Sequence, residues 1–210
     1  KKFIHYLLSC NAGEIVTMFL ASLLGWPVPL FPIQILWINL VTDGLPALAL
    51  GMDPVEKDIM KRPPRRTDEP VIGRKQSRLL LVQGLFIGLC ALLAFAFVLF
   101  IEKEDIGRAR TAALFALTCG QLFHAVNSRS LDKSIFALGV FSNAKLLFAC
   151  LASLSLQVAI MYIPFTQRIF KVVALGPVDL LAVLVASSLP FWAMEAAKAL
   201  HRRFRFLPSY

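Results

Sequence analysis

The chain has 210 residues, of which 58% are hydrophobic and only 17% are charged, and its mean hydropathy is +0.70. A typical soluble domain carries about 25% charged residues, and a soluble fold of this size has too little core to bury so many apolar side chains. The formal net charge of +9 forms no basic stripe interleaved with aromatic residues, so a nucleic-acid partner is not expected. The composition predicts an all-α, polytopic membrane protein surrounded by a lipid bilayer.

Uncharged stretches long enough to cross a bilayer recur along the chain. Residues 79–101 and 146–167 contain no Asp, Glu, Lys or Arg, and a helix of about 20 apolar residues spans the hydrocarbon core. In chain order, the pattern predicts six transmembrane helices, over residues 3–24, 32–52, 79–101, 112–127, 145–163 and 180–200. The longest connection between them is the charged loop 53–78.

Positive residues are unequally distributed between the two ends of these helices. Of the 22 Lys and Arg residues, 17 lie on the side that receives both termini and the 53–78 loop. Cytoplasmic loops of membrane proteins carry the excess of Lys and Arg, so we expect both termini and this loop to be cytoplasmic. The chain does not begin with Met, and we expect it to be part of a longer protein.

Two acidic residues, Glu14 and Asp43, lie deep within the first two expected spans, with no Lys or Arg at the same depth. A carboxylate near the bilayer centre is costly, so it usually faces a partner or an ion pathway. Asn11 precedes Glu14 by three residues and shares its helix face. Thr42 and Asp43 follow Asn39 by three and four residues, so these three share a face as well.

This set of carboxylate, amide and hydroxyl oxygens is the kind that a hard cation such as Ca²⁺ prefers. Gly44 and Pro46, directly after Asp43, are expected to unwind the second span locally and to free main-chain carbonyls for coordination. Gln121 in the fourth span offers a further oxygen, whereas His124 is expected to be a hydrogen-bonded interior histidine. The alternative interpretation is a polar network that only packs the helices together.

Three segments of the sequence resemble the P-type calcium-transporting ATPases. They are FIHYLLSCNAGEI from Phe3, NLVTDGLPALALG from Asn39 and DIMKRPPR from Asp58. The chain as a whole is similar to the last six transmembrane helices of that family. The resemblance implies the cation-transport domain of an ATP-driven Ca²⁺ pump working by alternating access, and Mn²⁺ is an alternative cargo because the same branch includes manganese-tolerant pumps.

The resemblance also implies which residues coordinate the ion. The family's positions fall on Asn11, Glu14, Asn39, Thr42 and Asp43, with Asp43 shared between two cation sites. Two-site pumps of the family carry Glu at position 121, whereas this chain has Gln121, as single-site pumps do. One and two ions per cycle therefore both remain open at this point.

The partners and the energy source follow from the same resemblance. The Asp58–Arg65 stretch is expected to contact the phosphorylation domain, and ATP and Mg²⁺ are expected to act only through the phosphorylation, nucleotide and actuator domains outside this chain.

Glu14 and Asp43 without a bound cation favour at least one protonated carboxyl group, which predicts proton countertransport. The membrane would be the plasma membrane in a bacterium, and otherwise an internal or plasma membrane.

Two other functions use the same polar residues. A self-contained ion channel or ion-coupled carrier would place them along its own pathway, and a structural membrane anchor would use them only to join helices. The residues encoded upstream of Lys1 would separate these alternatives, because a pump requires an aspartyl-phosphate loop there.

Overall fold

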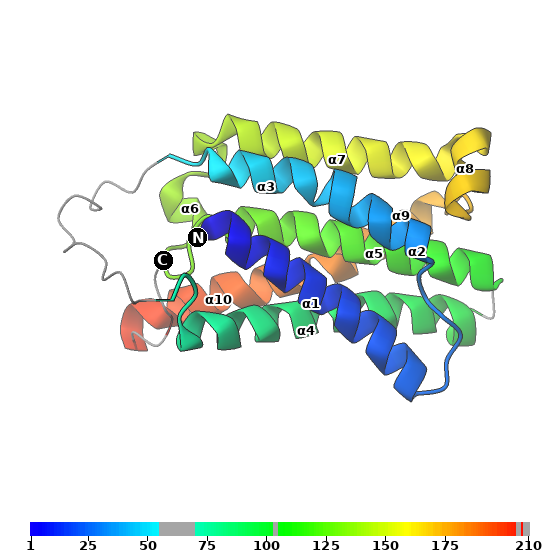
Figure 1. The fold of residues 1–210 in the computed structure, drawn as a ribbon, viewed down its shortest axis with the longest axis horizontal. Coiled ribbons are helices and arrows are strands. Elements are labelled where there is room, and N and C mark those ends of the chain that lie inside the picture. The colour runs from blue at the N-terminus through cyan, green and yellow to red at the C-terminus, as the bar shows by residue number, and fades with distance from the viewer. Residues whose placement is uncertain (55–69, 103–104, 205–206, 208–210) are drawn as a thin grey trace.

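The computed structural model describes residues 1–54, 70–102, 105–204 and 207, and every regular element in these ranges is a helix (Figure 1). The expected all-helical polytopic bundle is confirmed. The Asp58–Arg65 stretch, expected to contact a phosphorylation domain, lies outside the described residues. The elements are α1 (Lys2–Leu23), α2 (Pro32–Trp37), the π-helix η1 (Ile38–Thr42), α3 (Gly44–Gly51), α4 (Arg74–Ala96), the π-helix η3 (Phe97–Ile101), α5 (Ile106–Asn127), α6 (Ile135–Leu138), the short 3₁₀-helix η4 (Val140–Ser142), α7 (Ala144–Tyr162), α8 (Pro164–Phe170), α9 (Pro177–Ser187) and α10 (Leu189–Phe204).

Five helical stretches of the described chain are both long and apolar enough to cross a membrane. They are Lys2–Leu23, Pro32–Gly51, Arg74–Phe100, Ala144–Tyr162 and Pro177–His201. Large apolar side chains on their outer faces are widely exposed, among them Phe148 at 75% and Leu40 at 71%. A surface of this kind is a liability in water, and it matches the hydrocarbon of a bilayer.

Helix α5 corresponds to the remaining expected span and occupies the centre of the bundle. It has 22 residues, most of them buried, and it contacts α4, α7, α9 and α10 (Figure 1). A helix enclosed by other helices does not need an apolar surface, which explains why it carries Thr118, Gln121 and Asn127. That all six segments cross a membrane stays a prediction.

The last expected span is divided into two helices. α9 ends at Ser187 and α10 begins at Leu189, where the sequence predicted one helix over residues 180–200. Pro190 explains the break, because proline has no N–H to donate and its ring clashes with the carbonyl four residues earlier. α1 begins and α10 ends at the same end of the bundle (Figure 1), as expected for a chain with both termini on one side.

Helices α1 and α4 cross with their backbones in close contact. A Cβ atom at Gly84 would lie 2.7 Å from the Ser9 carbonyl oxygen, and one at Gly88 would lie 2.6 Å from the Gly13 carbonyl oxygen. Thr17 Oγ1 also donates a hydrogen bond of 3.2 Å to the Gly88 carbonyl. Small residues permit this approach between membrane helices, and they fix the position of α1.

Adding a methyl group at this crossing is expected to force the two helices apart. Gly88→Ala should lower the stability of the bundle by about 1–3 kcal/mol, the usual cost of overpacking a well-packed contact. Gly51→Ala is the matched control, because a Cβ there meets nothing within 4 Å. Thermal unfolding in detergent measures both variants, and equal unfolding temperatures for the two would contradict the close packing.

Candidate functional site

The second expected span is interrupted where the polar residues lie. Asp43 N–H donates to the Ile38 carbonyl at 2.8 Å, five residues back, so the chain forms a wide π turn rather than a regular α-helical turn. Pro46 has no N–H, which removes one further helix hydrogen bond. The second span is therefore interrupted before Gly44 and Pro46, as a widened turn over Ile38–Thr42, whereas Gly44–Gly51 form the regular helix α3. That this turn frees main-chain carbonyls for coordination stays a prediction. π turns inside α-helices occur frequently at functional sites.

Three of the expected site residues meet through direct hydrogen bonds. Asn39 Nδ2 donates to Glu14 Oε2 at 2.7 Å, and Gln121 Nε2 donates to Glu14 Oε1 at 3.2 Å. The Glu14 carboxylate, only 6% exposed, thus lies between two amides that come from η1 and α5. Helices α1, η1 and α5 converge on this one side chain.

Asp43 is completely buried. Its Oδ1 accepts a hydrogen bond of 2.9 Å from the hydroxyl group of Tyr6, which lies on α1 like Glu14. Thr42, also fully buried, donates to the Ile38 carbonyl at 3.1 Å. Neither Glu14 nor Asp43 belongs to an ion pair formed within the described ranges.

Two buried oxygen atoms at this site have no hydrogen-bond donor within the described part of the chain. They are Asp43 Oδ2 and Gln121 Oε1. A buried polar atom without a partner is costly, more so in a membrane span that excludes water. Both atoms are acceptors, so a cation or a donor molecule would satisfy them.

Asn11 is an expected ligand that the structure turns away from this group. Its side chain is exposed on the outer surface of α1, whereas Glu14, three residues later, is buried. Within the described residues no group of three or more His, Cys, Asp or Glu side chains gathers as a metal site.

Tyr6 is a site residue that the sequence reasoning missed. It is fully buried and holds Asp43 through its hydroxyl group. A sequence signal was present, because Tyr6, Cys10 and Glu14 follow each other at intervals of four residues and so form a stripe along α1. Aromatic residues near a span end commonly anchor a helix at the membrane interface, and for this reason Tyr6 was not recognised as a member of the stripe.

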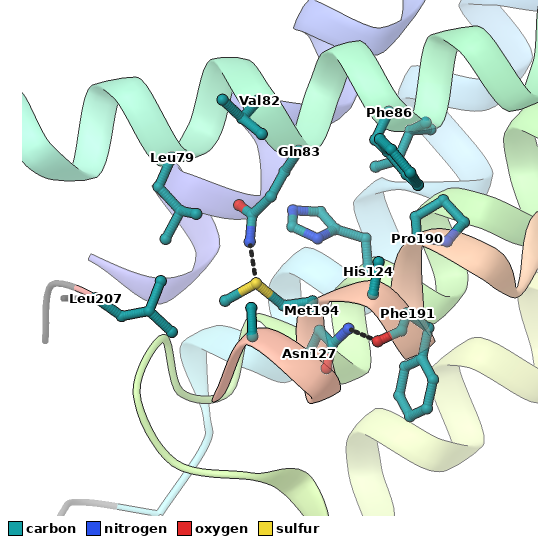
Figure 2. A pocket seen from close by; sticks show the side chains of 13 residues that line it. Leu79, Val82, Gln83, Phe86, His124, Asn127, Pro190, Phe191, Met194 and Leu207 are labelled. Atoms are coloured by element: carbon teal, nitrogen blue, oxygen red, sulfur yellow. Dashed lines mark hydrogen bonds between the residues drawn. The ribbon is translucent and has the colours of Figure 1, made fainter. Parts of the chain in front are cut away.

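His124 is the hydrogen-bonded interior histidine that was expected. It is buried, its Nε2 lies 3.3 Å from Ser128 Oγ, and its ring centroid lies 5.9 Å from that of Tyr6. His124 also lines an apolar pocket of about 310 Å³ between α4, α5 and α10 (Figure 2). Gln83 and Asn127 in its wall bond to Met194 Sδ and to the Phe191 carbonyl. The pocket wall contains no carboxylate, so the pocket does not resemble a cation site.

Comparison with known proteins gives one family and several similar chains. The family "Cation transporting ATPase, C-terminus" matches residues 27–200. A calcium-transporting ATPase of Bacillus subtilis (strain 168) is 45% identical over 197 residues, which cover 94% of this chain and 22% of that protein. The endoplasmic reticulum calcium ATPase srcA of Aspergillus fumigatus is 33% identical, covering 100% of this chain and 25% of its own length. The human calcium-transporting ATPase type 2C member 1 is 33% identical, covering 96% and 22%. The chain thus spans about a quarter or less of the length of these relatives.

Proposed function

Because the chain belongs to the family of cation-transporting ATPase C-terminal regions, we propose that it is the ion-carrying transmembrane domain of an ATP-driven Ca²⁺ pump. The observation that carries this proposal is the presence of two buried acceptors without a donor in the described residues, Asp43 Oδ2 and Gln121 Oε1; the Gln121 amide also donates to the Glu14 carboxylate. Oxygen acceptors without donors, inside a helix bundle that binds lipid, suit a hard cation as cargo. The names of the similar proteins support calcium as that cargo.

The candidate ligands are Glu14, Asn39, Thr42, Asp43, Gln121 and Asn11. Asn39 and Gln121 now turn their N–H groups toward Glu14. A cation bound to Glu14 takes the place of these donors, and each amide then presents its oxygen after a half-turn about its last side-chain bond. The amides thus exchange a hydrogen-bonding role for a coordinating role without moving the helices.

Transport requires the site to open to each side of the membrane in turn. The π turn at Ile38–Thr42 and Gly44 are the weak points of the second span, so we infer that α2 and η1 change position there. In this proposal, phosphorylation by ATP in the remaining domains supplies the energy, and these domains act through the Asp58–Arg65 stretch, which lies outside the described residues. Protons that neutralise Glu14 or Asp43 after cation release return in the opposite direction, as countertransport.

Reconstituted full-length protein tests the proposal. ATP should drive uptake of ⁴⁵Ca²⁺ into sealed vesicles, Mn²⁺ should compete because carboxylate and amide oxygens also suit it, and the vesicle interior should become more alkaline during uptake. Uptake without ATP would instead indicate a channel or carrier. No cation transport, together with intact folding, would indicate a structural anchor.

The charge of the site predicts one Ca²⁺ per transport cycle. Glu14 and Asp43 together balance one divalent ion, and a second ion would leave excess positive charge in a low-dielectric interior, where it is expensive. Asn11, a main candidate for a second site, is turned outward. Equilibrium ⁴⁵Ca²⁺ binding should give one ion per phosphorylatable site in the full-length protein. Two ions bound cooperatively would overturn this stoichiometry.

A further inference from the structure

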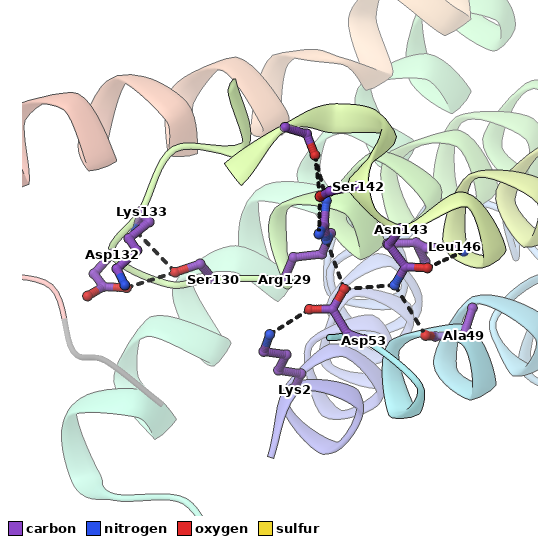
Figure 3. Close-up of polar contacts among 11 residues, drawn as sticks. Lys2, Ala49, Asp53, Arg129, Ser130, Asp132, Lys133, Ser142, Asn143 and Leu146 are labelled. Atoms are coloured by element: carbon purple, nitrogen blue, oxygen red, sulfur yellow. Dashed lines mark hydrogen bonds and ion pairs between the residues drawn. The ribbon is translucent and has the colours of Figure 1, made fainter. Parts of the chain in front are cut away.

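A buried polar cluster joins four segments at the end of the bundle where α1 begins (Figure 3). Asp53, two residues after the end of α3, accepts hydrogen bonds from Lys2 Nζ at 2.6 Å, Arg129 Nε at 3.0 Å and Asn143 Nδ2 at 2.7 Å. We call these four residues the Asp53 cluster. They belong to the first turn of α1, the end of α3, the chain after α5 and the start of α7.

The cluster is largely shielded from solvent and its geometry is fixed on every side. The side chains of Asp53 and Arg129 are 4% and 6% exposed. Arg129 also donates to the Gly139 carbonyl at 3.0 Å and to Ser142 Oγ at 2.7 Å, which anchors the connection between α5 and α7 (Figure 3). Shielded, multiply bonded charge pairs are much less mobile than surface pairs, so the cluster is a rigid point.

Three helices have one end at the Asp53 cluster, and each is associated with one candidate cation ligand: Glu14 lies in α1, Asp43 directly precedes α3 and Gln121 lies in α5. Glu14 follows Lys2 by 12 residues, Asp43 precedes Asp53 by 10 residues and Gln121 precedes Arg129 by 8 residues. At about 1.5 Å per helical residue, each ligand lies about 12–18 Å along its helix from the cluster. The Asp53 carboxylate therefore connects the ends of the three helices. The axial positions of these helices determine whether their ligands lie at the same depth in the bundle.

We propose that Asp53 is a positioning residue for the cation site. By fixing the axial positions of α1, α3 and α5 at one end, it sets how Glu14, Asp43 and Gln121 face each other. Asp53 touches no candidate ligand, so it acts only through the helices. This inference rests on the proposed function, since it concerns the affinity of that same site.

A second ion pair on α5 provides a matched control. Arg108 Nη2 lies 2.7 Å from Asp179 Oδ2 and joins the first turn of α5 to the first turn of α9. This pair has the same chemistry and shares α5 with the cluster, but α9 carries no candidate ligand. Loss of this pair removes an Arg–Asp contact without releasing two ligand-bearing helices from each other.

The experiment compares Asp53→Asn, Lys2→Met and Asp179→Asn in the reconstituted full-length protein. The readouts are the Ca²⁺ concentration that gives half-maximal phosphorylation by ATP, the maximal phosphorylation at saturating Ca²⁺, and the unfolding temperature. Asp53→Asn is expected to weaken Ca²⁺ affinity by about tenfold, within the range that residues without direct contact to a ligand exert on a distant site. Maximal phosphorylation should be retained, because no ligand is removed. Lys2→Met, which releases only α1, should give a smaller shift in the same direction.

Asp179→Asn should keep the wild-type Ca²⁺ affinity. Wild-type affinity in both Asp53→Asn and Lys2→Met would overturn the proposal, as would an equal loss in Asp179→Asn. If Asp53→Asn does not fold, Lys2→Met decides, because its side chain is 19% exposed and its removal leaves the Asp53–Arg129 pair in place. A wild-type protein without Ca²⁺-dependent phosphorylation would instead refute the proposed function.

Discussion

Asp43→Asn in the full-length protein is expected to abolish Ca²⁺-dependent phosphorylation by ATP, even at about a hundred times the Ca²⁺ concentration that saturates the wild type. Asp43 is completely buried, and its Oδ2 has no donor within the described residues. Asparagine preserves the shape and the acceptor for Tyr6, so the variant removes mainly one negative charge. In a low-dielectric site, that loss readily exceeds the ~2.7 kcal/mol that a hundredfold change in affinity represents.

Phosphorylation by radiolabelled ATP over a range of Ca²⁺ concentrations measures this effect. Asp132→Asn is the matched control, because Asp132 lies in the connection after α5 and bonds only to Ser130 Oγ at 2.8 Å in the described contacts. It should behave as the wild type. Normal Ca²⁺ activation of Asp43→Asn would show that the cation is held elsewhere.

Glu195→Ala is expected to destabilise the bundle by about 3–5 kcal/mol, the usual cost of removing one partner from a buried ion pair. Lys198 is 1% exposed, and its Nζ donates to Glu195 Oε1 at 2.9 Å and to two oxygens of Asn127 at 3.1 Å each. Without Glu195, the buried ammonium group keeps only the two neutral Asn127 oxygens among its acceptors in the described residues. Ser134 Oγ, which donates to Glu195 Oε2 at 2.6 Å, loses this acceptor as well.

The double variant Glu195→Met/Lys198→Met separates the ion pair from the packing around it. Replacing both members with apolar side chains of similar length removes the uncompensated charge, so most of the lost stability should return. Thermal unfolding in detergent measures both variants. A double variant as unstable as Glu195→Ala would mean that the hydrogen bonds to Asn127 and Ser134, rather than the charge, hold α10.

The positions of most helices were predictable from the sequence because a bilayer demands long apolar stretches. The helix ends were less predictable, since α4 starts at Arg74 and α5 at Ile106, several residues before the apolar runs begin. Backbone hydrogen bonding continues beyond the hydrocarbon, where polar residues are tolerated. The separation of α9 from α10 depends on Pro190, and a pattern of apolar residues alone does not predict a helix break at a proline.

The candidate site was partly predictable for a related reason. The residue spacing predicted that Asn39, Thr42 and Asp43 share one helix face. It did not predict how each helix is rotated relative to the bundle interior. Asn11 and Glu14 are three residues apart and therefore differ by about 60° around the helix, which is enough to expose one and bury the other. The Asp53 cluster joins residues up to 141 positions apart along the chain, so only the fold reveals it.

A structure of the full-length protein with bound cation tests the central claim most directly. Crystals grown with Mn²⁺ in place of Ca²⁺ would locate the ion by its anomalous scattering. We expect one ion, within about 2.1–2.6 Å of Asp43 Oδ2 and of oxygens from Glu14 and Gln121, with the Asn39 and Gln121 amides turned to present their oxygens. An ion bound elsewhere in the bundle, with Asp43 Oδ2 satisfied by water alone, would contradict the account.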